Sequence, residues 1–408
     1  MSTVIPAAWP KVRLGEIGQS LIGLTYSPNN VNPSGTLVLR SSNIQEGSLS
    51  FDDTVYVNCS IPDRIRVREN DILICVRNGS RRLIGKSVML DKRVIGETFG
   101  AFMAIYRSDA NPYLRYFFQS DQFKNQIDAH LGATINQITN GSLNNFVVTL
   151  PPKAEQRAIA ELLTQADQII TILERLIAKK QAIKQGMMQQ LLTGRTRLPG
   201  FTKEWREVRL GEVTTWMSGG TPSRERAEYW AGDVPWISAS TLKDIEVSHS
   251  DQCISAEAVR SSSKMAPLGS TLLLVRGSAL HKEIRASLVV ADVCFNQDVK
   301  ALVPARELRP KFLTYLIHGH AGELLKLVSS AGNTAGVLDT AVVQSFVVRI
   351  PHVTEQQRII SVLDDVNKEL TALQHRLTKA RNIMTGMTQH QRTERARLAV
   401  ASEKRVTW

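Results

Sequence analysis

The sequence is poor in cysteine and contains no long apolar run. Its four cysteines (Cys59, Cys75, Cys253 and Cys294) lie far apart in 408 residues, which argues against a zinc or disulfide framework and for a reducing compartment. No stretch approaches the ~20 apolar residues that cross a bilayer. The N-terminus lacks the basic-then-apolar order of a secretory signal. We therefore expect a cytoplasmic protein that makes no contact with a membrane.

Complete catalytic and metal-binding motifs are missing as well. The stretch Gly79–Ser87 resembles a phosphate-binding loop, but five residues instead of four separate its glycines, so we expect a basic hairpin loop. Asn111-Pro112-Tyr113 lacks one proline of the motif with which amino-methyltransferases hold adenine, and it is typical of a helix start. His318 and His320 have no third ligand at a sensible spacing, which favours a solvated helix end. The sequence predicts no catalytic residue and no metal site in this chain.

Positive charge is present in excess and is unevenly distributed. The formal net charge is +12 and the sequence pI is about 9.6, a balance that favours a polyanionic partner such as nucleic acid. Residues 151–197 hold 8 basic and 4 acidic side chains, and residues 351–408 hold 10 and 6. These two short segments therefore carry eight of the twelve excess charges.

Both basic segments follow copies of the same sequence. FVVTLPPKAEQRAIAELL (146–163) returns as FVVRIPHVTEQQRIISVL (346–363), and WPKVRLGEI (9–17) returns as WREVRLGEV (205–213). Shorter matches lie between them, namely DILICVRNGS (71–80) with STLLLVRGS (270–278) and GATINQI (132–138) with GNTAGVL (332–338). By contrast, LIGLTYSPNN (21–30) bears little relation to MSGGTPSRER (217–226). The chain is thus an internal repeat in which shared segments alternate with segments whose sequence differs between the two copies.

Each copy of the repeat continues into a long helix with a heptad pattern. In the first copy the apolar series are Ile159, Ala166, Leu173 and Met187, interrupted by Lys180, and Leu162, Ile169, Leu176 and Ile183. In the second copy they are Ile359, Val366, Leu373, Ala380 and Met387, and Leu363, Leu370, Leu377 and Met384. Each helix could fold back on its own domain, but alternating steps of three and four favour an antiparallel coiled coil of about 60 Å. Thr193-Gly194 should end the first helix.

The other parts of each half read as a mixed fold. Short β-rich runs such as DILICV (71–76) and TLLLVR (271–276) are separated by Gly, Asn and Ser, and helical stretches follow at 112–131 and 310–328. We predict an α/β (α+β) fold with two pseudo-symmetric domains joined by a long antiparallel two-helix coiled coil. The predicted segments are domain 1 at 1–150, helix 1 at 151–197, domain 2 at 198–350, and helix 2 with a basic C-terminal tail at 351–408.

Two variable domains, each followed by a Pro-x-x-x-Glu-Gln helix, resemble the specificity subunit of type I restriction–modification enzymes over essentially the whole chain. The motifs are Pro151/Glu155/Gln156 and Pro351/Glu355/Gln356, KQGMMQQLLTGRTRLPGF (184–201), and SGGTPSRERAEYWAGDVPWIS (218–238), which looks like the opening loop of a target-recognition domain. VLRSSNIQEG (38–47) looks like the equivalent region of the first domain.

The resemblance implies a non-catalytic protein that recognises DNA. Each domain would read one half of a bipartite double-stranded target, and the helices would serve as a spacer and as the docking surface for two methyltransferase subunits. Those subunits would carry S-adenosylmethionine, and restriction/translocase subunits would use ATP and Mg; no cofactor is expected in this chain. The predicted docking and coiled-coil residues are Glu155, Gln156, Ile159, Leu162, Leu173, Leu176, Glu355, Gln356, Ile359, Leu363, Leu370 and Leu373.

Candidate DNA-reading residues lie in loops where the halves differ, because base edges are read by side chains while Lys and Arg on phosphates supply affinity. In domain 1 they are Tyr26, Arg40, Ser41, Asn43, Arg77, Asn78, Ser80, Arg81, Arg82 and Lys86. In domain 2 they are Thr221, Ser223, Arg224, Arg226, Ser240, Arg276, Ser278, His281 and Lys282. Arg77 and Arg276 occupy matching strand ends, which suits either a reader or a structural arginine. The alternatives are a coiled-coil scaffold that reads no DNA sequence and a nucleoside-triphosphatase at Gly79–Ser87.

Overall fold

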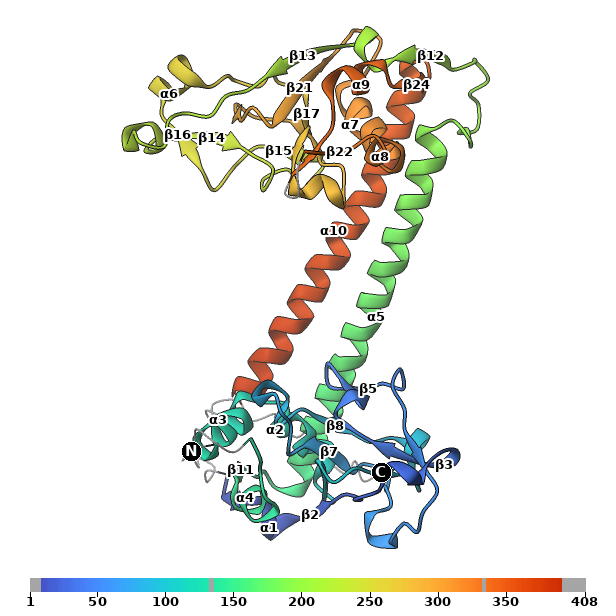
Figure 1. Ribbon diagram of the computed structural model, residues 1–408, viewed down its shortest axis with the longest axis vertical. Helices are drawn as coiled ribbons and strands as arrows, with labels where there is room; N and C mark the ends of the chain where they lie inside the picture. Colours follow the sequence, from blue (N-terminus) through green and yellow to red (C-terminus); the bar gives the residue numbers. More distant parts are fainter. Residues whose placement is uncertain (1–8, 132–135, 332–334, 391–408) are drawn as a thin grey trace, which may run out of the picture. The chain divides into compact units, whose positions relative to one another are not determined.

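The computed structural model describes residues 9–131, 136–331 and 335–390 (Figure 1). The predicted basic tail from residue 391 onward, and parts of the GATINQI and GNTAGVL matches, lie outside the described residues. The chain forms two compact units. Unit 1 contains Met1–Ile172 and Leu377–Trp408, and unit 2 contains Leu173–Arg376. Unit 1 therefore contains most of the first repeat and the end of the second long helix. Unit 2 contains most of the second repeat and the end of the first long helix.

Unit 1 is built on a four-stranded antiparallel sheet in the order β2-β10-β7-β8. Its central strand β7 has the sequence ILIC, and all four side chains are buried, as expected for a strand covered on both faces. The strands are β1 (Lys11–Arg13), β2 (Gln19–Ile22), β3 (Val31–Leu39), β4 (Ile44–Gln45), β5 (Ser48–Leu49), β6 (Tyr56–Val57), β7 (Ile72–Cys75), β8 (Ser87–Met89), β9 (Thr98–Phe99), β10 (Met103–Arg107) and β11 (Val147–Thr149). The helices are α1 (Leu14–Ile17), α2 (Asn111–Phe118), α3 (Asp121–His130) and α4 (Asn140–Asn145).

Unit 2 repeats this topology. Its large sheet has the order β13-β21-β17-β19-β15, and the parallel pair β14-β20 matches the pair β3-β9 of unit 1. The strands are β12 (Arg206–Arg209), β13 (Thr214–Ser218), β14 (Val234–Ile237), β15 (Glu246–Val247), β16 (Cys253–Ile254), β17 (Thr271–Leu274), β18 (Arg276–Gly277), β19 (Ala286–Val289), β20 (Cys294–Phe295), β21 (Val299–Pro304), β22 (Ser329–Ala331), β23 (Ala335–Val337) and β24 (Val347–Ile350). The helices are α6 (Ala256–Ser262), α7 (Pro310–Gly319), α8 (Ala321–Leu325) and α9 (Thr340–Ser345). The predicted α/β fold with two pseudo-symmetric domains is confirmed.

The first and last segments of each domain lie against each other. In unit 1, β1 pairs with β11, and the Leu14 N–H donates to the Phe146 carbonyl at 2.9 Å. In unit 2, β12 pairs with β24, and the Leu210 N–H donates to the Phe346 carbonyl at 3.0 Å. Each domain thus starts and finishes at one point, directly before its long helix.

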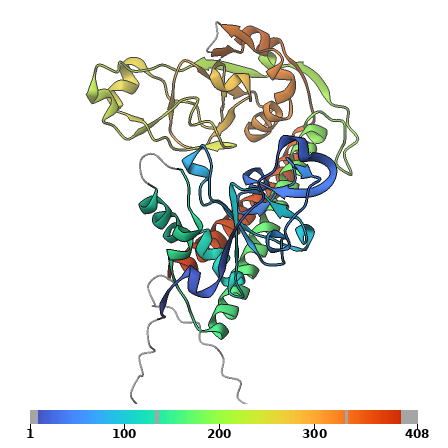
Figure 2. The same ribbon diagram turned by 60° about the horizontal axis from the view of Figure 1, so that its bottom comes forward.

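The two long helices are α5 (Lys153–Leu192) and α10 (Val353–His390), and they run side by side in Figures 1 and 2. Their directions are antiparallel. In unit 2 the end of α5 shares a core with the start of α10, and in unit 1 Met384 near the end of α10 packs on the core that contains Ile159 near the start of α5. Gly194, with φ of +69°, follows α5 as the predicted stop. No described helix is long and apolar enough to cross a membrane.

The heptad pattern is confirmed in α10 but was placed wrongly in part of α5. In α10 the inward positions are the predicted ones as far as Met384, while the side chain of Met387 is outside the described residues. In α5 the series from Ile159 is correct, but Ile169, Leu176 and Ile183 are 53%, 38% and 44% exposed. The inward positions of α5 are Ile159, Leu163, Ala166, Ile170, Leu173, Ile177, Lys180, Lys184, Met187, Met188 and Leu191. The second series is therefore shifted by one residue from the prediction.

Two charged residues of α5 occupy inward positions where the pattern calls for apolar side chains. Lys180 interrupts the first series, and its ammonium forms an ion pair with the Glu369 carboxylate of α10. Lys184 is half-buried, and this burial lowers the pKa of its ammonium. Lys180, which interrupts the apolar series, thus forms an ion pair between the two helices. Such a polar contact can fix the register of the helix pair.

The shifted register predicts different effects for two adjacent leucines. Leu163 is 1% exposed and belongs to the core of unit 1, whereas Leu162 is only half-buried. We expect Leu163→Ala to lower the free energy of unfolding by about 3 kcal/mol, because it leaves a cavity, and Leu162→Ala to lower it by about 1 kcal/mol or less. Urea unfolding of the two variants gives the comparison. If Leu162→Ala lowered the free energy of unfolding more than Leu163→Ala, the result would support the register predicted from the sequence and contradict the register of the structure.

Candidate nucleic-acid interface

The Pro-x-x-x-Glu-Gln motif attaches each long helix to its own domain. In unit 1 the Trp9 indole N–H donates to the Glu155 carboxylate at 3.2 Å, and the Gln156 amide donates to the Pro151 carbonyl at 2.7 Å. In unit 2 the Trp205 indole donates to Glu355 at 3.2 Å, and Gln356 donates to Pro351 at 2.9 Å. The repeated sequence therefore encodes a repeated set of contacts within the chain.

These contacts correct part of the predicted docking surface. Glu355 is 1% exposed, and Arg197 donates two hydrogen bonds to its carboxylate at 2.8 and 2.7 Å. Gln356 is fully buried, and its amide also donates to the Glu307 carbonyl and accepts from the Arg309 N–H, both at 2.8 Å. Gln156, Ile159, Ile359, Leu363 and Leu370 are buried as well, which suits the coiled-coil role predicted for the four apolar residues and leaves none of these side chains on an outer surface. They hold the helices to the domains and to each other.

The outer face of α5 carries apolar side chains that do not contribute to either core. Ile169, Ile172, Leu176 and Ile183 are between 38% and 62% exposed and recur at helical spacing. Of the predicted docking residues, Leu176 belongs to this group, whereas Leu162, Leu173 and Leu373 are half-buried. The exposed group is the part of α5 that is chemically suited to a partner.

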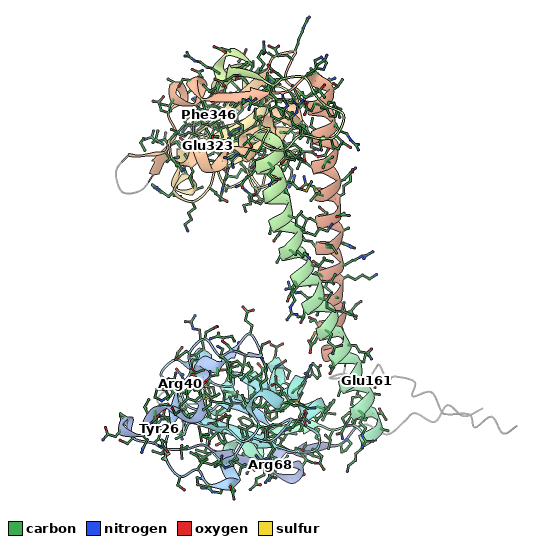
Figure 3. The ribbon with its side chains drawn as sticks, turned by 90° about the vertical axis from the view of Figure 1, so that its right-hand side faces the viewer. Tyr26, Arg40, Arg68, Glu161, Glu323 and Phe346 are labelled. Atoms are coloured by element: carbon green, nitrogen blue, oxygen red, sulfur yellow. The ribbon has the colours of Figure 1, made fainter. Side chains whose placement is uncertain are left out.

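In unit 1 most of the predicted reading residues come together at one end of the large sheet. Arg77 follows β7, and its backbone N–H donates at 3.1 Å to the carbonyl of Phe102, which precedes β10. Lys86 precedes β8, and its carbonyl accepts from the Cys75 N–H at 2.8 Å. Tyr26 follows β2 and lies on a part of the unit remote from Glu161 of α5, as does Arg40 (Figure 3). Loops of three antiparallel strands thus converge without involving the helix pair.

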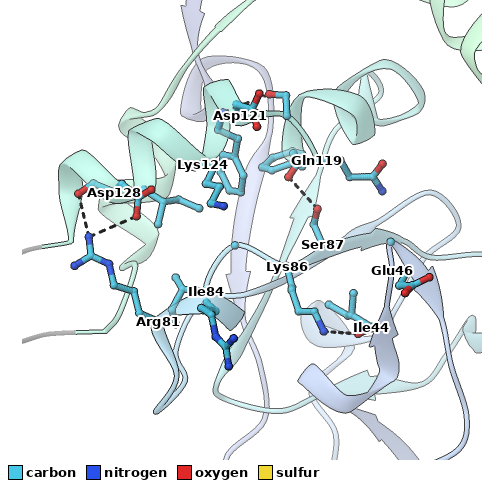
Figure 4. Close-up of a pocket in the computed structure, with 17 residues that line it drawn as sticks. Ile44, Glu46, Arg81, Ile84, Lys86, Ser87, Gln119, Asp121, Lys124 and Asp128 are labelled. Atoms are coloured by element: carbon cyan, nitrogen blue, oxygen red, sulfur yellow. Dashed lines mark hydrogen bonds and ion pairs between the residues drawn. The ribbon is translucent and has the colours of Figure 1, made fainter. Parts of the chain in front are cut away.

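The arginine-rich loop between β7 and β8 borders a cavity of about 720 Å³ (Figure 4). Its lining includes the basic residues Arg81, Arg82, Lys86 and Lys124 and the acidic residues Glu46, Asp121 and Asp128. Arg81 forms an ion pair with Asp128 at 3.5 Å, and the Lys86 ammonium donates to the Ile44 carbonyl at 3.0 Å. Lys86 therefore ties the loop to the neighbouring segment, whereas Arg77 and Arg82 are exposed residues.

One predicted reader in unit 1 is structural, and two others connect loops. Asn43 is fully buried; its amide donates to the Ser50 and Asp53 carbonyls, and its side-chain oxygen accepts from the Arg40 N–H. It cannot reach DNA, so this prediction is wrong. The Asn78 amide lies 3.4 Å from the Ser41 hydroxyl and links their two loops. The Ser80 N–H donates to Asn78, and Arg40 forms an ion pair with Asp53 at 2.7 Å.

Unit 2 has the same arrangement with different side chains. Arg276 follows β17, and its N–H donates at 3.3 Å to the carbonyl of Asp298, which precedes β21. It therefore matches Arg77, as the sequence predicts. The loop after β13 starts at Gly219, where an added Cβ would lie 2.1 Å from the Phe295 carbonyl. Gly23 of unit 1 stands in the same relation to Phe99, at 2.3 Å, so the loops at 21–30 and 217–226 are equivalent although their sequences look unrelated.

All nine predicted reading residues of unit 2 are exposed, namely Thr221, Ser223, Arg224, Arg226, Ser240, Arg276, Ser278, His281 and Lys282. Several are held by neighbours. The Thr221 hydroxyl bonds to Gln297, the Ser223 carbonyl accepts from the Trp230 indole at 3.0 Å, and Ser240 bonds to Ser238. Arg226 donates to the Tyr229 hydroxyl at 2.7 Å. Unit 2 thus presents a polar and basic loop surface.

The stretches of sequence that resemble catalytic or metal-binding motifs have structural roles. Helix α2 starts at Asn111, and the Gly79–Ser87 stretch joins the antiparallel strands β7 and β8, as predicted. The histidines are not a solvated helix end: His318 is half-buried and contacts the Ala286 carbonyl, and His320 is 8% exposed and packs edge-on against Phe346. Burial lowers the pKa of His318. No group of three or more potential metal ligands occurs within the described ranges.

Several residues of the two loop surfaces were not predicted. Phe102 is 58% exposed, and the Arg77 guanidinium lies 5.2 Å from the centre of its ring. Gln252, Gln297 and Trp230 contact predicted readers of unit 2. An exposed phenylalanine next to a strand cannot be distinguished from a core residue in one sequence, because apolar pattern alone indicates burial. The glutamines carried no motif, and only the fold places them beside the readers.

A family model agrees with the internal repeat. The model described as "Type I restriction modification DNA specificity domain" matches residues 6–185 and 202–380. The two matches cover most of both units and most of both long helices.

Individual relatives and a solved structure are similar in parts or over the full length. The EcoR124I/EcoR124II specificity subunit of Escherichia coli is 34% identical over 163 residues, which is 40% of this chain and 40% of that protein. The StySPI specificity subunit of Salmonella potsdam is 22% identical over 94% of this chain and 88% of its own length. The type I restriction-modification system S subunit from M. genitalium is 16% identical, with a TM-score of 0.56 over 96% of this chain and 98% of that one, a likeness of fold.

Proposed function

Because this chain belongs to the family of type I restriction–modification DNA specificity domains, we propose that it is the subunit that selects the DNA target of such a complex. Each unit would read one half of a bipartite double-stranded target through the loops at the end of its large sheet. The chain itself would perform no chemistry.

The observation that carries this proposal is the equivalence of Arg77 and Arg276. Each follows the central strand of a repeated sheet, each is exposed, and each donates its backbone N–H to the residue that precedes the neighbouring strand. The loops around the two arginines differ in sequence and in their contacts. A constant frame with different exposed side chains suits two readings of two different base sequences, since direct readout depends on individual side chains. The net charge of +12 supplies attraction for phosphates.

The partners we propose follow from the same family. Two methyltransferase subunits would dock along the helix pair, where Ile169, Ile172, Leu176 and Ile183 offer exposed apolar area, and restriction/translocase subunits would join them in the cytoplasm. S-adenosylmethionine, ATP and Mg would be held by those partners. The helix pair would also act as a spacer that sets the gap between the half-targets.

The proposal predicts a bipartite methylation pattern. We expect cells that express this chain together with its methyltransferase subunits to carry N6-methyladenine in one split motif with a fixed gap. Genome-wide mapping of the modified base is the measurement, and cells with the methyltransferase subunits alone are the control. Methylation that is absent, or that has the same pattern without this chain, would contradict the proposal and favour a scaffold that reads no sequence.

A further inference from the structure

The Arg224 guanidinium of unit 2 lies over an aromatic ring, at a distance that leaves room only for a stacked arrangement. Its guanidinium carbon lies 3.5 Å from the centre of the Trp230 ring and 5.5 Å from that of Trp236. The Nη2 group also donates to the Gln252 side-chain oxygen at 2.9 Å. Arg224 is nevertheless exposed, so the plane of an accessible cation is fixed by two contacts.

The aromatic support is itself rigid. The Trp230 indole donates to the Ser223 carbonyl at 3.0 Å, and its ring meets that of Trp236 edge-to-face, with centres 5.0 Å apart and an angle of 85°. Trp236 is 4% exposed and donates to the Gly220 carbonyl at 3.1 Å. Both bonds anchor the loop that contains Arg224. The backbone carbonyl of Gln252 accepts from the backbone N–H of Trp236 at 2.8 Å, which places Gln252 next to Trp236.

A fixed guanidinium plane is more than contact with a phosphate requires. A phosphate needs a positive charge within reach, which a mobile lysine or arginine provides. Bidentate contact with guanine O6 and N7 needs two parallel N–H groups in a defined plane. One of the five guanidinium N–H groups of Arg224 is used by Gln252, and enough remain for this pair of bonds. Ordering the side chain before DNA arrives also lowers the entropy lost on binding.

We propose that Arg224 reads a guanine in the half-target of unit 2, and that Trp230 and Gln252 are positioning residues for it. This inference rests on the proposed DNA-reading function and specifies a base for one position. The matching loop of unit 1, LIGLTYSPNN (21–30), contains neither an arginine nor a tryptophan, so it carries no copy of this arrangement. A reader present in only one unit is consistent with half-targets that differ in sequence.

The test uses the full chain and duplexes that carry its mapped target, with each base pair of the unit 2 half-target replaced in turn. We expect Arg224→Ala to reduce discrimination at one G·C pair by roughly 5- to 150-fold and to leave the unit 1 half-target unaffected. Arg224→Lys keeps the charge but not the flat fork, so it should lose the same discrimination. Trp230→Ala should lose most of it, whereas Trp230→Phe, which keeps a ring under the guanidinium, should retain most.

Other outcomes are separable. If Arg224→Ala weakens all duplexes equally and lowers the salt dependence by about one phosphate contact, Arg224 binds the backbone and the inference is wrong. If discrimination at every pair is unchanged, Arg224 is structural and the inference is wrong. Retained discrimination at the other base pairs of the unit 2 half-target shows that unit 2 of each variant is folded. A wild-type chain that discriminates neither half-target would instead refute the proposed function.

Discussion

Exchange of residues 15–145 for the matching segment of a related chain is expected to change one half of the DNA target and to leave the other half as it was. The two boundaries lie next to each other, since Leu14 and Phe146 on either side of the segment are joined by a backbone hydrogen bond of 2.9 Å. The strand pair β1-β11 and the long helices remain from the original chain. The exchanged part carries the whole large sheet of unit 1 and its loops.

The donor segment must keep two contacts to the helix. Arg115 forms an ion pair with Asp167 of α5, and the Tyr116 hydroxyl donates to the same carboxylate at 3.0 Å. With these residues present, we expect the new half-target to replace the old one completely, because each mismatched base pair costs about 1–3 kcal/mol. Methylation mapping in cells with the methyltransferase subunits gives the readout. Exchange of residues 211–345, bounded by the equivalent Leu210–Phe346 bond, is the matched control and should change only the other half. A change in both halves, or in neither, would contradict independent reading by the two units.

Removal of the Glu355 carboxylate is expected to destabilise unit 2 strongly. Glu355 is 1% exposed and accepts hydrogen bonds from Arg197 and Trp205, so Glu355→Ala leaves a partly buried guanidinium and a buried indole N–H without their acceptor. Leaving the buried Trp205 indole N–H without an acceptor, together with the loss of the charged hydrogen bonds, costs about 2 kcal/mol or more. Urea or thermal unfolding, analysed as separate transitions for the two units, measures the loss.

Glu155→Ala is the matched control within the same motif. Glu155 occupies the equivalent position but is half-buried, and the structure describes a bond to it from Trp9 at 3.2 Å. We expect a loss of about 1 kcal/mol, confined to unit 1. Glu355→Gln keeps an acceptor for Trp205 but removes the ion pair, so its loss should fall between the two. Equal small losses for Glu355→Ala and Glu155→Ala would show that the Arg197 pair contributes little to stability.

The sequence predicted the elements that depend on repetition better than those that depend on tertiary contacts. The motif at Pro151 and Pro351 identified the helix starts, but not that its Glu and Gln face inward, because hydrogen-bond partners such as Trp9 and Glu307 lie far away in the chain. In α5, adjacent apolar pairs such as Leu162-Leu163 and Leu176-Ile177 fit either register. The repeat held the missing signal, because subtracting its offset of 200 from Leu363 and Leu377 gives the correct members of both pairs.

The reading loops were predicted by their location, and individual residues only partly. A loop position between strands can be recognised from Gly, Asn and Ser in the sequence. Whether its side chain faces outward depends on the fold, which buries Asn43 beneath Ser50 and Asp53 and exposes Phe102. The equivalence of Gly23 and Gly219 could not be seen in the sequence. Each glycine is required because its backbone lies close to a carbonyl far away in the chain, and this requirement leaves only one shared glycine in the two loops.

The division of the chain into units has a consequence for synthesis on the ribosome. Unit 2 is one continuous segment, Leu173–Arg376, whereas unit 1 includes both the beginning of the chain and the end of α10, residues 377–390. Met384, which packs on the core of unit 1, leaves the ribosome after every residue of unit 2. Domains usually fold as they emerge, the N-terminal one first. Here the order of completion is reversed: the domain that is translated second can finish first, and the first waits for the last helix, so a prematurely terminated chain lacks a complete unit 1.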